Sequence, residues 1–350
     1  MPKNPYTLIF GKEPLQMISR TQQLMMIVEE FTSSMPSQQV FLISGVRGSG
    51  KTVLMTEVMK RLQQQEEWIT VELNPSRDML TALASKLSSN DLYARIFQKA
   101  KINLSFFGFG LEVSGIAPIT DVETALSKMI GALRDHGKRL LITVDEVVNT
   151  EYLRIFSSTF QILVREDLPV FLLMTGLFEN IRSLQDEKNL TFLYRAPRME
   201  LKPLNIGTIA ANYRNTIGVG ESESLHMAKL TKGYPFAFQV LGFFAWEHGG
   251  MNQTVLEEYQ RYLEEYVYEK IWSELSMKDR QLAYAVAISE NGKISEIRQK
   301  LGIDTNQFNP YRKRLIQKGI LNGDVRGYVS FTLPLFEKYV VENVEDADKD

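Results

Sequence analysis

The sequence contains no cysteine and only three histidines among its 350 residues. Without cysteine the chain cannot form a disulfide framework, a zinc finger, an iron–sulfur cluster or a thiol nucleophile. The histidines, His136, His226 and His248, are far apart in the chain and show no metal-binding spacing. The remaining chemistry therefore has to come from hydroxyl, carboxylate, amine and backbone groups.

Long apolar runs and an excess of basic residues are also missing. The most apolar stretch, residues 234–246, is about a dozen residues long, whereas a membrane-spanning helix needs about 20. Residues 1–12 contain no apolar signal-peptide core. A net charge of −2 gives no whole-chain indication of nucleic-acid binding. We therefore expect a cytoplasmic globular protein of two or three domains.

Residues 45–52 read GVRGSGKT, which is the complete G-x-x-x-x-G-K-[ST] motif of a phosphate-binding loop. An apolar run at 39–44 precedes the motif, and apolar residues at helical spacing follow it. In such a loop backbone N–H groups bind phosphate, the lysine bridges the β- and γ-phosphates, and the hydroxyl ligates Mg²⁺. The predicted ATP-binding residues are Gly45, Val46, Arg47, Gly48, Ser49, Gly50, Lys51 and Thr52.

Two adjacent acids follow a second apolar run. Residues 139–144 (RLLITV) predict a buried strand, and Asp145 and Glu146 come directly after it. Two carboxylates at the end of a buried strand cost free energy unless they are paired or bind a metal ion, so their presence indicates a function. In a phosphate-loop enzyme the first acid holds Mg²⁺ and the second polarises the attacking water. We therefore expect Asp145 to share Mg²⁺ with Thr52, and Glu146 to be catalytic together with Lys51.

Three further residues are candidates for catalysis. Thr175 follows a predicted strand at 169–174, where its hydroxyl would lie near the γ-phosphate and orient water. Arg195 and Arg198 precede the last predicted strand. Each is either an arginine finger that reaches a neighbour's nucleotide or an ordinary surface residue.

Two segments allow alternative interpretations. The Gly-Tyr-Pro turn that ends at Pro235 either only caps the helix after it or covers the base and ribose of the nucleotide. The segment 102–115 places phenylalanines among glycines, within Phe106–Phe109. It is predicted to be a β-hairpin packed on the domain, or else an exposed aromatic tip that contacts a partner.

The order of the elements indicates an α/β fold followed by two helical parts. Near-continuous apolar strands that alternate with helices are typical of a parallel sheet covered on both faces. The pattern is helical from 204 onward. We expect a phosphate-loop ATPase core at 1–203, a helical lid domain at 204–270, a winged helix at 271–340 and an acidic tail at 341–350.

The winged helix is predicted from three helices and two strands. The helices are expected at 277–289, 294–301 and 309–318, the last with Asn309 as its cap and Pro310 at its first position. The strands surround a turn at 322–324. The following residues, 337–350, are strongly acidic, and we expect them to be frayed.

Charge within the predicted winged helix differs from the whole-chain average. Residues 291–326 contain eight basic and three acidic residues, a net charge of +5. Arg312, Lys313 and Arg314 lie on the predicted third helix, where they would contact double-stranded DNA. The alternative is that these charges solvate an exposed helix and that the module binds a protein.

Together these motifs resemble the AAA-like ATPases of the STAND and archaeal-type ATPase branch, which are relatives of the origin-recognition ATPases. The resemblance rests on GVRGSGKT, LLITVDE, LLMTG, LYRAPR and the GYP turn. It implies a sheet of order 5-1-4-3-2, a helical lid and a C-terminal winged helix. It assigns Thr175 to the family's sensor position and Pro235 to the lid turn. The lid arginine of AAA proteins in the strict sense has no counterpart beside that turn.

Two functions fit this sequence. The first is a slow or partner-stimulated Mg²⁺-dependent ATPase that acts as a nucleotide-driven switch on DNA. The second is an ATP-binding signalling or scaffold protein with little hydrolysis, whose winged helix binds a protein partner or which self-associates. A small-molecule kinase is a third possibility, against which the added modules and the Asp-Glu pair argue.

Overall fold

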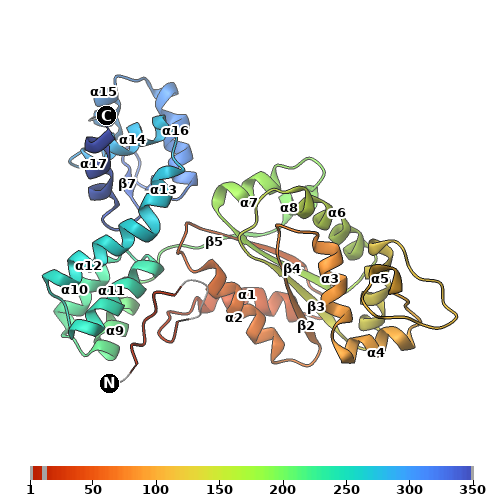
Figure 1. Ribbon diagram of the computed structural model, residues 1–350. Helices are drawn as coiled ribbons and strands as arrows, with labels where there is room; N and C mark the ends of the chain where they lie inside the picture. Colours follow the sequence, from red (N-terminus) through yellow and green to blue (C-terminus); the bar gives the residue numbers. More distant parts are fainter. Residues whose placement is uncertain (1–2, 10–13, 348–350) are drawn as a thin grey trace. The chain divides into compact units, whose positions relative to one another are not determined.

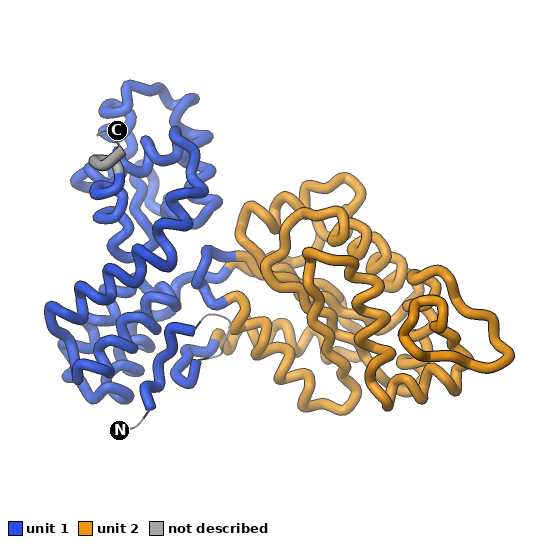
Figure 2. Tube along the Cα trace, viewed as in Figure 1, with its two compact units in different colours: residues 1–19, 45–50, 201–350 blue, residues 20–44, 51–200 orange. Residues whose placement is uncertain are grey.

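The computed structural model describes residues 3–9 and 14–347 of the chain. It divides into two compact units (Figure 2). The sheet unit, drawn in orange as unit 2, comprises Arg20–Ser44 and Lys51–Glu200. The helical unit, drawn in blue as unit 1, comprises Met1–Ser19, Gly45–Gly50 and Leu201–Asp350. No helix in the described ranges is both long and apolar enough to cross a membrane.

The sheet unit is built on a five-stranded parallel sheet of order β2-β3-β4-β1-β5 (Figure 1). Read from its other edge this is the predicted order 5-1-4-3-2, so the predicted fold class is confirmed. All neighbouring strands pair in parallel. The strands are β1 (Val40–Ser44), β2 (Trp68–Leu73), β3 (Arg139–Val144), β4 (Val170–Gly176) and β5 (Arg198–Glu200).

Helices cover both faces of this sheet, which explains why its strands are almost continuously apolar. On one face Phe41 and Phe171 of the strands contact Phe31 of α1, with ring centroids 5.5 and 5.1 Å away. On the other face Ile142 and Leu172 belong to the core formed with the helices from α3 onward. The helices are α1 (Thr21–Thr32), α2 (Lys51–Gln63), α3 (Met79–Ser88), α4 (Asp91–Lys99), α5 (Val122–Arg134), α6 (Glu151–Arg165), α7 (Phe178–Gln185) and α8 (Thr191–Arg195).

The helical unit contains four helices, a connecting segment and a C-terminal segment. Helix α12 runs directly into a π-helical turn, Glu264–Tyr268, and then into α13. The C-terminal segment has three helices, a short antiparallel ladder and a final helix. The elements are α9 (Ile206–Ile217), α10 (Glu221–Leu230), α11 (Pro235–His248), α12 (Gln253–Leu263), α13 (Glu269–Ser273), α14 (Met277–Ala287), α15 (Ile294–Leu301), α16 (Thr305–Gln317), β6 (Leu321–Asn322), β7 (Ser330–Phe331) and α17 (Phe336–Ala347).

Helix α16 begins earlier than the sequence suggested. Its N-cap is Asp304, which forms a capping box with Gln307, so Asn309 is not the cap. The predicted start is wrong because it places proline at the first helical position, whereas Pro310 lies inside the helix. A capping box satisfies two backbone N–H groups at once and defines the helix start.

The acidic C-terminal end is also more ordered than expected. Residues Phe336–Ala347 form α17, with Phe336 and Val340 fully buried. The expectation of a frayed segment was therefore wrong for the described part of this helix, because Phe336, Tyr339 and Val340 are buried in the core of the helical unit. Residues 348–350 of the predicted tail lie outside the described residues.

The aromatic segment is not the β-hairpin that was expected. Residues 102–119 are all described and contain no strand, only a short 3₁₀ turn at Ser105–Phe107. The N–H of Leu104 donates to Leu111 O at 2.8 Å, which closes the loop without a ladder. Phe107 and Phe109 stack and pack against the core, whereas Phe106 is 61% exposed.

Candidate functional site

The phosphate loop connects β1 to α2. Helix α2 begins at Lys51, so its positive N-terminal end follows the glycines directly. Gly48 and Gly50 have φ values of +68° and +86°, a region that favours glycine. A Cβ atom on Gly48 would lie 2.4 Å from Tyr234 Oη. Glycine is therefore required at position 48 both by the backbone conformation and by the close packing.

The predicted Mg²⁺ ligands lie next to each other in the sheet unit. The hydroxyl of Thr52 donates to Asp145 Oδ2 at 2.7 Å. A hydroxyl and a carboxylate are hard oxygen donors of the kind that Mg²⁺ prefers. Within the described ranges no group of three or more acidic or histidine side chains could enclose a metal. This donor set fits an ion held by two protein oxygens and completed by phosphate and water.

Thr175 connects the two acidic residues. Its buried hydroxyl donates to Asp145 Oδ1 and accepts the N–H of Glu146 at 3.3 Å. That N–H also donates to Asp145 Oδ1 at 3.0 Å. Because β3 and β4 are parallel neighbours, their carboxyl ends bring these side chains together as the sequence predicted. Thr175 thus orients the acidic pair, and its action on water stays a prediction.

Glu146 has an unusual backbone. Its φ is +50°, which a residue with a side chain rarely adopts, and its side chain is exposed. Such strain persists only where the surroundings determine it, and it often marks functional positions. The hydrogen bonds from Glu146 N–H to Thr175 and Asp145 provide those surroundings.

A pocket of about 410 Å³ opens beside the two acids. It is also lined by Asn74 and Arg77 of the loop after β2 and by Lys86 of α3. These residues were not among the predicted site residues. The signal was present, because polar residues that directly follow a parallel strand lie at the same edge of the sheet as those after its neighbour.

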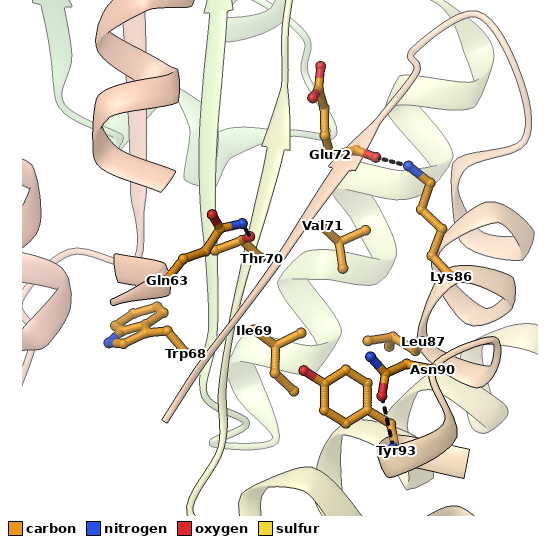
Figure 3. Close-up of a pocket in the computed structure, with 10 residues that line it drawn as sticks. All are labelled: Gln63, Trp68, Ile69, Thr70, Val71, Glu72, Lys86, Leu87, Asn90 and Tyr93. Atoms are coloured by element: carbon orange, nitrogen blue, oxygen red, sulfur yellow. Dashed lines mark hydrogen bonds between the residues drawn. The ribbon is translucent and has the colours of Figure 1, made fainter. Parts of the chain in front are cut away.

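A second pocket, of about 310 Å³, lies along the free edge of β2 (Figure 3). Lys86 reaches from α3 to β2, where its ammonium donates to Glu72 O at 2.6 Å (Figure 3). The same lysine and Glu72 line both pockets. Lys86 therefore connects α3 to the edge strand β2 at a point that both pockets share.

The Gly-Tyr-Pro turn contacts the phosphate loop within the helical unit. The hydroxyl of Tyr234 donates to Arg47 O at 2.6 Å, and the N–H of Phe236 donates to Gly48 O at 3.2 Å. Pro235 is the first residue of α11 and Tyr234 its N-cap. The turn therefore caps the helix and also holds the loop. Coverage of a base or ribose by Pro235 stays a prediction.

Part of the chain that contains this site is similar to a known protein family. Residues 16–163, which include the phosphate loop and both acids, match the family described as AAA ATPase domain. Residues 265–340 match a family described as "Domain of unknown function (DUF8462)". No protein in the search of curated proteins matches the chain.

Solved structures share the fold of the whole chain. The ORC2 protein of Aeropyrum pernix, solved in ADPNP–ADP complexes, has a TM-score of 0.64 at 13% identity, over 97% of this chain and 96% of that one. A Walker-type ATPase of Pyrococcus abyssi has a TM-score of 0.59 at 17% identity, over 89% and 94%. At these identities the similarity shows the fold alone, and this is the fold that the resemblance to origin-recognition-like ATPases implied.

The two candidate arginine fingers, Arg195 and Arg198, are exposed. Arg195 is the last residue of α8 and Arg198 the first of β5. Arg198 is in register with Leu42, two residues before the end of β1. Both therefore come before the carboxyl edge where Asp145 lies, and a role toward a neighbouring chain stays a prediction.

The three basic residues of α16 have different surroundings. Arg314 donates from Nε to Asp279 Oδ1 at 2.8 Å and lies over the ring of Tyr311. Arg312 donates to Gly323 O at 3.5 Å. Lys313 is exposed. Two of the three predicted DNA-binding residues thus make contacts inside the domain, and Lys313 faces solvent.

Proposed function

We propose that this protein is a Mg²⁺-dependent ATPase that works as a nucleotide-driven switch, with a winged helix that binds DNA. Asp145 carries this proposal, because its two carboxylate oxygens bond the hydroxyls of Thr52 and Thr175 while Glu146 follows it. We also assign residues 204–270 to a lid domain and residues 271–340 to a winged helix, an assignment supported by the helices of these segments and by the short antiparallel ladder of the second. The nucleotide complexes of the ORC2 protein support nucleotide binding by this fold.

The residues divide the reaction between them. When bound, Mg²⁺ neutralises charge on the phosphate oxygens. Lys51 and the loop N–H groups bind those phosphates, and Thr52 and Asp145 hold the ion. The exposed carboxylate of Glu146 accepts a proton from water as the water oxygen bonds the γ-phosphorus and ADP leaves. The pocket beside Asp145 and Glu146 provides room for that water.

Substitution Glu146→Gln separates binding from hydrolysis. We expect ATP to remain bound while turnover falls by about 10²–10⁴-fold, the usual contribution of a general base. Glu151→Gln, an exposed carboxylate at the first position of α6, makes the same charge change and serves as the control. Normal turnover in Glu146→Gln contradicts the assignment.

The DNA-binding part rests on the local charge of +5 and on the exposed residues of α16. Lys313 shares an exposed face of that helix with Asn306 and Asn309. Asparagine can read base edges and lysine can contact phosphate. Retention on double-stranded DNA at low salt, decreasing steeply as salt rises, is the expected result.

A second function is favoured by the internal contacts of Arg312 and Arg314, since these leave Lys313 as the exposed member of the three. In that case the chain binds ATP with little hydrolysis and its winged helix binds a protein. Tight ATP binding with negligible turnover, together with no retention on DNA at low salt, would support this function over the first.

A further inference from the structure

Two carbonyls of the phosphate loop accept hydrogen bonds from the Gly-Tyr-Pro turn and the start of α11. Tyr234 and the N–H of Phe236 bond the carbonyls of Arg47 and Gly48. The phenol of Tyr234 is almost fully buried, and burial raises its pKa above the ordinary value, so it remains a donor at neutral pH. In a phosphate loop the N–H groups bind the ligand, so contacts through carbonyls leave that function free.

The side chain of Arg47 extends this connection toward the winged helix. Its Nη2 lies 2.9 Å from Glu274 Oε1, at the C-terminal end of α13. Both side chains are about one-third exposed, and an ion pair of that kind contributes little to stability. Within residues 3–9 and 14–347, the buried Nε of Arg47 has no hydrogen-bond partner. The ion pair is thus better suited to fixing the position of Glu274 relative to the phosphate loop than to stabilising the fold.

Glu274 is followed by a tight polar junction. Two residues later Ser276 caps α14 and donates to Asp279 Oδ2 at 2.7 Å. Asp279 is only 2% exposed, and its other oxygen accepts the Nε of Arg314 at 2.8 Å. The ion pair of Glu274 with the phosphate loop is therefore joined by a short stretch of backbone to the contacts that connect α14 with α16.

We propose that Glu274 is a positioning residue which, through Arg47, couples nucleotide binding at the phosphate loop to the arrangement of α14 and α16. This proposal rests on the proposed function, because it requires nucleotide at the loop. A nucleotide that moves the side chain of Arg47 when it binds to the loop then alters the ion pair between Arg47 and Glu274. The same free energy appears at the winged helix as a change in its ligand affinity.

Amide hydrogen exchange of the full chain, with and without Mg²⁺ and a non-hydrolysable ATP analogue, tests the coupling. In the wild type we expect the analogue to change protection in residues 277–287 and 305–317. In Glu274→Gln the analogue still binds, measured separately by titration, and the change at these helices is lost. Lys270→Gln removes the other ion pair of Glu274, at 3.3 Å, and should respond as the wild type does.

A double-mutant cycle identifies the partner. Arg47→Gln should lose the response as Glu274→Gln does, and combining the two should cause no further loss. A wild-type response in Glu274→Gln with the analogue bound overturns the coupling while leaving the proposed function intact. Failure of the wild type to bind the analogue overturns both.

Discussion

The hydroxyl of Thr52 donates a hydrogen bond of 2.7 Å to Asp145 Oδ2. These two oxygens lie on different elements, α2 and the end of β3, and together they form the proposed Mg²⁺ position. Thr52→Ala removes one of them, so we expect nucleotide to remain bound while the Mg²⁺ concentration needed for half-maximal turnover rises by about 10- to 100-fold. Thr52→Ser keeps the hydroxyl and should behave nearly as the wild type. An unchanged Mg²⁺ dependence in Thr52→Ala would rule out this role.

Two glycines with similar backbones should respond differently to a methyl group. Gly48 and Gly108 have φ values of +68° and +73°. A Cβ on Gly48 meets Tyr234 Oη at 2.4 Å, whereas around Gly108 nothing lies within 4 Å. We expect Gly108→Ala to lower the free energy of unfolding by about 1 kcal/mol and Gly48→Ala by about 1–3 kcal/mol more, with weaker nucleotide binding. Equal losses in urea unfolding would contradict the packing argument.

Buried tyrosines should make the protein sensitive to alkaline pH. Burial raises the pKa of Tyr213, Tyr234, Tyr259 and Tyr268 above the ordinary value of about 10. Their contribution to stability is complete below pH 10. Above it the unfolded chain loses protons that the folded chain keeps, so the free energy of unfolding falls as pH rises. Each tyrosine contributes a slope of about 1.4 kcal/mol per pH unit.

Urea unfolding between pH 8 and 11.5 measures this slope. Tyr213→Phe removes one buried phenol, which donates to Phe238 O at 2.8 Å, and should reduce the slope by about 1.4 kcal/mol per pH unit. The same variant should be less stable than the wild type at pH 8, because it loses this buried hydrogen bond. A stability that stays constant up to pH 11.5 would exclude the linkage.

Adjacent residues of α16 should have separate effects on stability and DNA binding. Arg314→Ala removes the partner of the buried carboxylate of Asp279, at an expected cost of about 1–3 kcal/mol in unfolding. Lys313→Ala should change stability by less than about 0.5 kcal/mol. In binding to double-stranded DNA it should reduce the slope of log K against log salt by about 1. A salt slope unaffected by Lys313→Ala would favour the protein-binding alternative.

The parts of the fold that could be predicted are those with a local pattern. Buried parallel strands are continuous apolar runs, so residues 139–144 could be assigned to a strand with its observed bounds. The carboxyl ends of parallel strands share one edge, so the order of the elements was enough to predict Thr175 beside Asp145. Glycine and proline patterns located the phosphate loop and the start of α11 at Pro235.

The parts that were missed depend on contacts between distant residues. No local pattern connects Tyr234 with Arg47, 187 residues earlier, or Arg47 with Glu274. The start of α16 was misplaced because two local signals competed, and the capping box at Asp304 outweighed Pro310. Competing signals of similar free energy are resolved by packing, in this case by the buried Phe308, which lies within the turn that the prediction left out.

The left-handed backbone of Glu146 implies that the residue best for stability at this position differs from the residue proposed for activity. A side chain at φ +50° costs about 1–3 kcal/mol, a cost from which glycine is exempt. Glycine at this position would therefore strengthen the fold while removing the carboxylate to which we assign proton transfer from water. Glutamate is then maintained at this position by selection for catalysis, although glycine would give a more stable fold. In descendants that had ceased to hydrolyse ATP, residue 146 would be among the first to change, and its identity would record that loss.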